Sequence, residues 1–155
     1  MNRTTYEIRQ ANDALAAEKI LRSLPEWFGI ESAIVNYCEG VKTLPSYFVV
    51  RPDGSNIAFM TLKFHNQFTS EIHVMGVLKE FQSQGIGRLL VDKAEEIARE
   101  RNSQYLMVKT LGPSHPDKNY ARTREFYLNT GFCPLEEFRS IWDENNPCLI
   151  LVKKI

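Results

Sequence analysis

Residues 77–88 read Val-Leu-Lys-Glu-Phe-Gln-Ser-Gln-Gly-Ile-Gly-Arg, and this stretch decides how the whole chain is interpreted. It follows an alternating, strand-like segment at residues 68–77 and precedes residues 86–101, where apolar residues recur at helical spacing. The first N–H groups of a helix have no partner within it, and the helix dipole adds partial positive charge. Gly85 and Gly87 let the backbone approach an anion closely. The stretch is therefore typical of a phosphate cradle at a helix start.

The residues beside the two glycines exclude two other kinds of phosphate loop. A nucleotide P-loop needs lysine and then serine or threonine after its last glycine, whereas Gly87 is followed by Arg88 and Leu89. A dinucleotide-binding fingerprint needs a third glycine at the position of Leu90. A tight turn without a ligand remains the alternative to an anion site, because glycine is common in turns.

Hydropathy patterns on both sides of the loop predict one mixed α/β domain over residues 1–155. Strands are expected at residues 4–9, 46–51, 57–65, 68–77, 105–109, 133–138 and 148–152. Helices are expected at residues 13–24, 31–41, 86–101 and 120–130. The apolar stripe of the helix after the loop is expected to consist of Ile86, Leu89, Leu90, Ala94, Ile97 and Ala98.

Composition narrows the class of function. Lysine plus arginine and aspartate plus glutamate number 19 each, so the net charge is zero and a nucleic-acid partner is not expected. The N-terminus has no apolar signal region, and no apolar run approaches the ~20 residues that cross a bilayer. Cys38, Cys133 and Cys148 indicate reduced thiols in a cytoplasmic protein. No histidines stand at metal-ligand spacing, so we expect no metal.

Two segments resemble the signatures of a known family. The segment Gln82-Ser-Gln-Gly85-Ile-Gly87 resembles the Q/R-x-x-G-x-G/A loop of the GNAT N-acetyltransferases, which also lies between a strand and a helix. Residues 125–132, Glu-Phe-Tyr-Leu-Asn-Thr-Gly-Phe, resemble the second signature of that family. The element order matches over nearly the whole chain. The resemblance implies a mixed, mostly antiparallel sheet of about seven strands with helices on both faces.

The same resemblance implies acetyl-CoA as the cosubstrate. Its pyrophosphate would lie on residues 82–88, and its pantetheine arm would pair with residues 75–77, where the strand splays from its neighbour. Gly76 is expected to mark a bulge. Many members carry asparagine at the position of Tyr120, where this chain has Asn119 beside it. The implied cofactor-binding residues are Met75, Gly76, Val77, Gln82, Ser83, Gln84, Gly85, Ile86, Gly87, Arg88, Asn119, Tyr120 and Tyr127.

Acetyl transfer to an amine needs a base, a donor to the carbonyl oxygen and an acid for the leaving thiolate. Glu71 is expected as the base, because it lies eleven residues before Gln82, as the strand glutamate does in family members that use one. His73 shares a strand face with Glu71 and is the alternative base. Tyr127 is expected as the acid, and the Met75 N–H as the donor. Each residue also has a structural alternative: a solvated Glu71, a hydrogen-bonded His73 and a packing Tyr127.

The acceptor is expected to be a primary amine of a small molecule, a peptide or a protein, acetylated directly in a ternary complex. Residues 25–40 and 138–147 are expected to build the acceptor site, and their acidic and tryptophan side chains would suit a cationic amine. An acyl-cysteine route is less attractive, because no cysteine lies near the loop in sequence. The alternative function is a non-catalytic acyl-CoA-binding sensor module. We expect neither nucleic acid nor membrane as a partner, and a homodimer is left open.

Overall fold

The computed structural model describes residues 5–155, which form two compact units. The first unit holds residues 5–63 and 73–93, and the second holds residues 64–72 and 94–155. The start of the first expected strand, Thr4, lies outside the described residues. The single domain expected over residues 1–155 stays a prediction.

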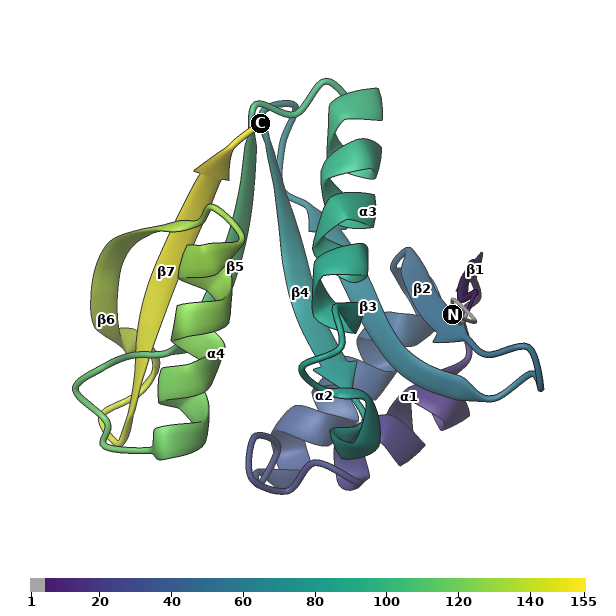
Figure 1. Cartoon of the computed structure of the whole chain (residues 1–155). Coiled ribbons are helices and arrows are strands. Elements are labelled where there is room, and N and C mark those ends of the chain that lie inside the picture. The colour runs from purple at the N-terminus through teal and green to yellow at the C-terminus, as the bar shows by residue number, and fades with distance from the viewer. Residues whose placement is uncertain (1–4) are drawn as a thin grey trace. The chain divides into compact units, whose positions relative to one another are not determined.

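The expected helices and strands are all found, with their ends shifted by a few residues (Figure 1). In chain order they are β1 Glu7–Gln10, α1 Ala14–Arg22, α2 Glu31–Thr43, β2 Ser46–Val50, β3 Asn56–Phe64, β4 Thr69–Val77, the 3-10 helix η1 Lys79–Phe81, α3 Ile86–Glu100, β5 Tyr105–Leu111, α4 Lys118–Asn129, β6 Cys133–Asp143 and β7 Asn146–Lys154. The largest difference is the extension of β6 to Asp143. The Asp143 carboxylate closes the β6–β7 turn by accepting hydrogen bonds from Asn145 N–H and the Asn146 amide.

The strands form one seven-stranded sheet in the order β1-β2-β3-β4-β5-β7-β6. β1 pairs with β2, β2 with β3, β5 with β7, and β6 with β7, all antiparallel. The pairing of β4 with β5 is parallel and joins Thr69–Ile72 to Tyr105–Val108. The mixed, mostly antiparallel sheet expected from the sequence is therefore confirmed.

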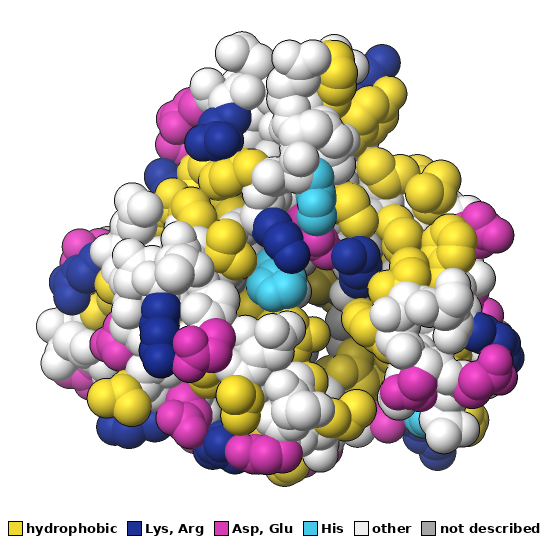
Figure 2. All heavy atoms as spheres, turned by 180° about the vertical axis from the view of Figure 1, so that it is seen from behind, with side chains coloured by type: hydrophobic (Ala, Val, Ile, Leu, Met, Phe, Trp, Pro, Cys, Tyr) yellow, Lys and Arg dark blue, Asp and Glu magenta, His cyan; other side chains and the backbone are white. Residues whose placement is uncertain are grey.

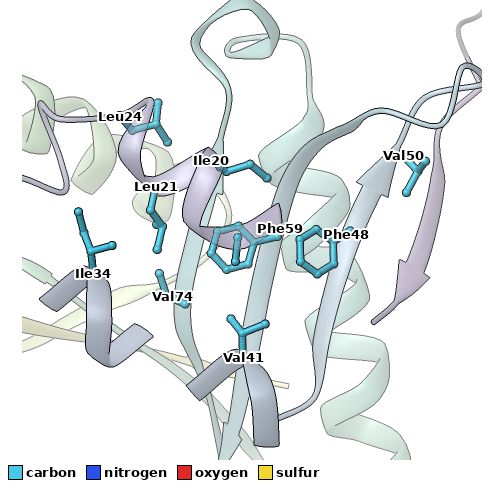
Figure 3. Packing of buried hydrophobic residues seen from close by; sticks show 10 residues of the cluster. Ile20, Leu21, Leu24, Ile34, Val41, Phe48, Val50, Phe59 and Val74 are labelled. Carbon is cyan, nitrogen blue, oxygen red and sulfur yellow. The ribbon is translucent and has the colours of Figure 1, made fainter. Parts of the chain in front are cut away.

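The core of the first unit lies where α1 and α2 meet the strands (Figure 3). The Asp13 carboxylate caps α1 by accepting the Ala16 N–H at 3.0 Å. The rings of Phe48 and Phe59 stack at a centroid distance of 5.6 Å on neighbouring strands. The buried residues of the cluster are Ala17, Ile20, Leu21, Leu24, Ile34, Val41, Phe48, Val50, Phe59 and Val74. Burying one side chain of this size contributes about 1.5–3 kcal/mol, so the cluster fixes how α1 lies on β4.

Gly76 owes its place on β4 to this packing. A Cβ atom at Gly76 would lie 3.3 Å from Ile20 Cγ2 and 3.3 Å from Leu24 Cδ1, both on the α1 side of the core. Glycine inside a strand often marks a close approach of another backbone or element. The close packing of α1 therefore gives a reason for this glycine, whereas the bulge expected there stays a prediction.

The buried stripe of α3 differs from the expected one at one position. Leu89 is exposed, whereas Val91 is buried. Successive residues of an α-helix are turned by about 100°, and Leu89 is turned well away from the centre of the face that carries Leu90 and Ala94. Val91 lies at the other edge of that face. The predicted helical period was therefore correct. The predicted centre of the buried face differs from the observed one by less than the ~100° turn between successive residues.

The surface carries charges of both signs. Figure 2 shows acidic and basic side chains interspersed over the face that it displays, in keeping with the net charge of zero. None of the helices in residues 5–155 is long and apolar enough to cross a membrane.

The packing of α1 on β4 predicts opposite effects for two glycine substitutions. Gly76→Val should lower the free energy of unfolding by about 1–3 kcal/mol, because its methyl groups would overlap Ile20 and Leu24. The control is Gly40→Ala in α2, whose Cβ would find its nearest neighbour at an ordinary 3.6 Å. That variant should gain up to about 1 kcal/mol from helix propensity. Urea unfolding measures both, and a stable Gly76→Val would contradict the packing.

Candidate functional site

The loop that follows β4 turns sharply before α3 begins. Ser83 and Gly85 have positive φ angles of 61° and 85°, which only glycine adopts without cost. The Gln82 side-chain amide donates to the Val77 carbonyl at 3.0 Å, and the Gln84 amide donates to the Glu80 carbonyl at 2.9 Å. Both glutamines therefore tie the loop to itself, and the turn leads the backbone directly into the helix.

The start of α3 presents a row of backbone donors. The Leu89 N–H donates to the Gly85 carbonyl at 3.1 Å, which makes Gly85 the first residue bonded into the helix. The N–H groups of Ile86, Gly87 and Arg88 come before that bond, so the helix itself offers them no carbonyl four residues back. These donors and the helix dipole favour an anion at this point. Gln82–Arg88 thus lie at the turn into α3, and their expected role as a phosphate cradle stays a prediction.

Contacts within the first unit hold the loop in place. The Leu78 N–H donates to the Ile57 carbonyl on β3 at 2.9 Å. The Arg51 guanidinium lies 5.2 Å from the centre of the Phe81 ring. Lys79 forms an ion pair with Glu26 from the segment between α1 and α2. The hydrogen bond from the Lys79 ammonium lowers the pKa of the Glu26 carboxyl. The loop is therefore anchored before any ligand arrives.

Glu71 is almost fully buried, at 2% side-chain exposure, near the start of β4. Its Oε1 lies 2.7 Å from His65 Nε2, and its Oε2 lies 3.7 Å from the Lys109 ammonium. A solvated Glu71 is therefore wrong. Sequence analysis had placed His65 only at a strand end. The signal that could have found the pair is the short turn between them, since diagonal neighbours on adjacent strands lie within reach of long side chains.

Cys148 lies close enough to Glu71 and Lys109 for their charges to affect the pKa of its thiol. Burial raises the pKa of the Cys148 thiol to about 11, while Lys109 acts in the opposite direction and Glu71 adds to the increase. A thiolate is the nucleophilic form of cysteine, and this environment disfavours it. The geometry therefore gives no support to an acyl-cysteine route through Cys148.

His73 belongs to the first unit and packs among aromatic rings. Its ring lies edge-on to Tyr37 at a centroid distance of 5.3 Å, and Tyr37 lies edge-on to Phe28 at 6.1 Å. The Gly40 backbone comes close enough that a Cβ there would lie 3.8 Å from the His73 ring. His73 is thus a half-buried member of the face that α2 covers, and its role as a base stays a prediction.

Tyr127 lies in α4, in the second unit, and is only 7% exposed. Its ring contacts Phe126 at 5.4 Å and Phe132 at 5.5 Å between centroids. At the other end of α4 the Asp117 carboxylate caps the helix, accepting the N–H groups of Asn119 and Tyr120 at 2.8 and 3.0 Å. These two backbone donors are therefore engaged. Contacts of Asn119 and Tyr120 to a cofactor would have to come from their side chains.

The acidic residues of the segment 25–40, expected to attract a cationic acceptor, already have partners. In addition to Glu26, which pairs with Lys79, the Glu31 carboxylate accepts a forked hydrogen bond from Arg22 at 2.8 Å. Glu39 pairs with Lys42 at 2.8 Å. The negative charge of the segment at residues 25–40 is thus largely balanced within the segment and its neighbours, so a cationic acceptor gains less there than the sequence indicated.

Comparison with known proteins identifies the family to which the chain is similar. The sequence model of the Acetyltransferase (GNAT) family matches residues 14–132. An uncharacterized N-acetyltransferase of Chlorobaculum tepidum is 32% identical over 100 residues, which cover 64% of this chain and 63% of that protein. The chain thus aligns with less than two thirds of the length of this curated relative.

Solved structures share the fold. A GNAT-family protein from Desulfovibrio desulfuricans superposes with a TM-score of 0.83 at 18% identity, covering 97% of this chain and 99% of that one. A GNAT acetyltransferase from Elizabethkingia anophelis with acetyl-CoA bound has a TM-score of 0.72 at 17% identity, covering 97% and 98%. The family match spans most of the chain and includes both the glycine loop and the tyrosine segment, so the chain belongs to the GNAT family of acetyltransferases.

Proposed function

We propose that the protein transfers an acetyl group from acetyl-CoA to a primary amine, directly and within a ternary complex. The observation that carries this proposal is the pair of backbone donors at Ile86 and Gly87 at the start of α3, in a loop that is anchored before a ligand arrives. Family membership supports the same cosubstrate, and a protein of the same fold has acetyl-CoA bound.

Acetyl-CoA would lie along the end of β4 and the start of α3. The pyrophosphate would accept hydrogen bonds from the N–H groups at the α3 start, with the Arg88 guanidinium adding positive charge. The pantetheine amides would pair with the backbone of Met75–Val77, in the manner of an added strand. The side chains of Asn119 and Tyr120 are the proposed contacts farther along the cofactor.

The chemistry requires little of the protein beyond proton handling and orientation. Glu71 is the proposed acid–base residue of β4, with His73 as the alternative. The Met75 N–H would donate to the thioester oxygen as negative charge develops there. The Tyr127 hydroxyl would donate to the departing CoA sulfur. Its burial favours this role, because a hydrogen bond to an anion is stronger where water is excluded.

The acceptor is proposed to be a primary amine of a small molecule or of a peptide or protein. Because Glu31 and Glu39 are already paired with basic residues, an acceptor with a single positive charge fits this chain better than a polycation. We also propose a cytoplasmic protein, in which the free thiols of Cys38, Cys133 and Cys148 stay reduced. Nucleic acid and membrane are not proposed as partners, and the oligomeric state is left open.

A non-catalytic acyl-CoA sensor is the second candidate. The internal pairing of acidic residues in the expected acceptor segment favours it, since that pairing weakens the attraction of an amine. A sensor would bind acetyl-CoA but release no thiol with any amine. Measuring CoA thiol release over a panel of amino acids, polyamines, aminoglycosides and peptides separates the two functions.

The cradle at α3 predicts stabilisation by acetyl-CoA. At 100 times its Kd the ligand should add about 2.7 kcal/mol to the free energy of unfolding. For a chain of this size that raises Tm by roughly 5–10 °C. Gly87→Glu should remove the shift while leaving a folded protein, because the new carboxylate would occupy and repel the phosphate position. Differential scanning fluorimetry measures the shift.

The control for that variant is Gln104→Glu, which adds the same charge at an exposed position before β5. It should retain the shift. Loss of the shift in both variants would point to general charge repulsion, and retention in Gly87→Glu would place the cofactor elsewhere.

The buried hydroxyl of Tyr127 predicts a kinetic effect without a binding effect. Tyr127→Phe keeps the ring packed between Phe126 and Phe132 and removes only the donor. If Tyr127 protonates the leaving thiolate, kcat should fall by ~10²–10⁴ while the Kd for acetyl-CoA changes little. Steady-state kinetics with one identified amine measure this. Near-normal turnover would reduce Tyr127 to a packing residue.

Two variants of β4 separate the candidate bases. Glu71→Gln should lower the rate at neutral pH, with partial recovery at high pH, where more of the amine is already neutral. His73→Gln should have a small effect if Glu71 carries the acid–base chemistry, and a large one if His73 does. Both variants need the same acceptor, because amines differ in their own pKa. Unchanged rates in both would leave water as the base.

A further inference from the structure

His65 and Glu71 form a pair in which the imidazole is accessible and the carboxylate is not. The two side chains meet at 2.7 Å between Nε2 and Oε1. Glu71 is 2% exposed, whereas His65 is 32% exposed. Lys109, on β5, approaches the other carboxylate oxygen at 3.7 Å and is 30% exposed. The carboxylate is therefore covered by two partly exposed basic side chains.

This arrangement decides which ring nitrogen of His65 can accept a proton. An ionised carboxylate can only accept hydrogen bonds. In the state in which Glu71 is ionised, His65 Nε2 therefore carries the hydrogen that bonds it. In the neutral ring the other nitrogen, Nδ1, is then the proton acceptor. The same carboxylate stabilises the imidazolium that forms when Nδ1 takes a proton.

We propose that His65 is the general base of the reaction and that Glu71 is its positioning residue. This inference rests on the proposed function, and it moves the proton-accepting step from the Glu71 carboxylate to its partner His65. A base must come within hydrogen-bond reach of the amine proton. The oxygens of Glu71 face His65 and Lys109, and the side chain has almost no accessible surface. The His65 ring is partly exposed to solvent, and its hydrogen bond to Glu71 fixes its orientation. In catalytic triads a histidine likewise transfers the proton while a buried carboxylate orients it.

The proton and electron balance of the step is simple. The ammonium form of the acceptor gives one proton to His65 Nδ1, which later releases it to solvent. The lone pair of the neutral amine forms the C–N bond to the thioester carbonyl carbon. The C–S bond then breaks, and the electron pair stays on the CoA sulfur. The sulfur takes a proton from the Tyr127 hydroxyl, and the second proton of the nitrogen replaces it, so the products are the amide and free CoA thiol.

Charged and titratable groups from three strands surround the pair. Glu71 on β4 places a negative side chain beside His65, and Lys109 on β5 places a positive one beside Glu71. Cys148, on β7, stays a neutral thiol because burial raises its pKa. Arg101 lies over the ring of Phe64, the residue before His65, at 3.7 Å, and adds positive charge to the same region. Removing the Glu71 charge changes this set of charges, so the pH profile of the rate should change with it.

The experiment measures kcat/KM against pH for the whole chain with acetyl-CoA and one acceptor that the wild-type protein acetylates. His65→Ala should lose ~10²–10⁴ of the rate at neutral pH, and added imidazole should restore part of it. Glu71→Gln should keep measurable activity with a pH profile that differs from that of the wild type. Glu71→Gln combined with His65→Gln should be no slower than His65→Gln alone, because the two residues act as a unit.

Controls separate this inference from the proposed function. His115→Gln removes the histidine outside β4 and its preceding turn, and should leave the rate and its pH profile near those of the wild type. A wild-type protein that binds acetyl-CoA but acetylates no amine would overturn the proposed function. An active wild type with full activity in His65→Gln, or a His65→Ala variant that folds but does not respond to imidazole, would overturn the role of His65 alone. Circular dichroism and the acetyl-CoA shift show that each variant is folded.

Discussion

The feature on which the candidate cofactor site depends is the set of backbone N–H groups at the start of α3 that the helix cannot satisfy. An α-helix must leave its first donors without internal partners, so the constraint is built into any helix. Here the helix begins directly after Gly85, and Gly87 stands in its first turn. The absence of Cβ atoms at these two positions lets a phosphate approach the backbone closely.

Those donors are useful only because the rest of the first unit holds them still. The Leu78 N–H is bonded to β3, Phe81 lies under Arg51, and Gln82 is bonded back to the end of β4. β4 itself is pressed against α1 where Gly76 leaves room for Ile20 and Leu24. A loop that is ordered in advance loses little conformational entropy when a ligand binds. The hydrophobic core and the anion cradle are thus parts of one arrangement.

The second unit solves a different physical problem, the burial of the Glu71 charge. An isolated carboxylate out of water is very costly, so it needs partners. His65 and Lys109 supply them from opposite neighbours of β4. A buried ion pair is weak evidence for stability, because desolvation offsets much of the attraction. Both partners are partly exposed, so the buried carboxylate stays connected to the surface through basic side chains.

The sequence by itself determined the element order, the glycine loop and the family, because these depend on local periodicity and on residues adjacent in the chain. It also determined the candidate cofactor loop, since Gln82–Arg88 is a single segment whose conformation follows from its own glycines and helix start. The tertiary structure alone decided the surroundings of Glu71. His65 reaches it across a turn and Lys109 from another strand, and no local pattern states which long side chains will meet. The prediction that Leu89 belongs to the buried stripe of α3 was wrong for the same reason. The elements that pack against a helix decide which of its faces is buried.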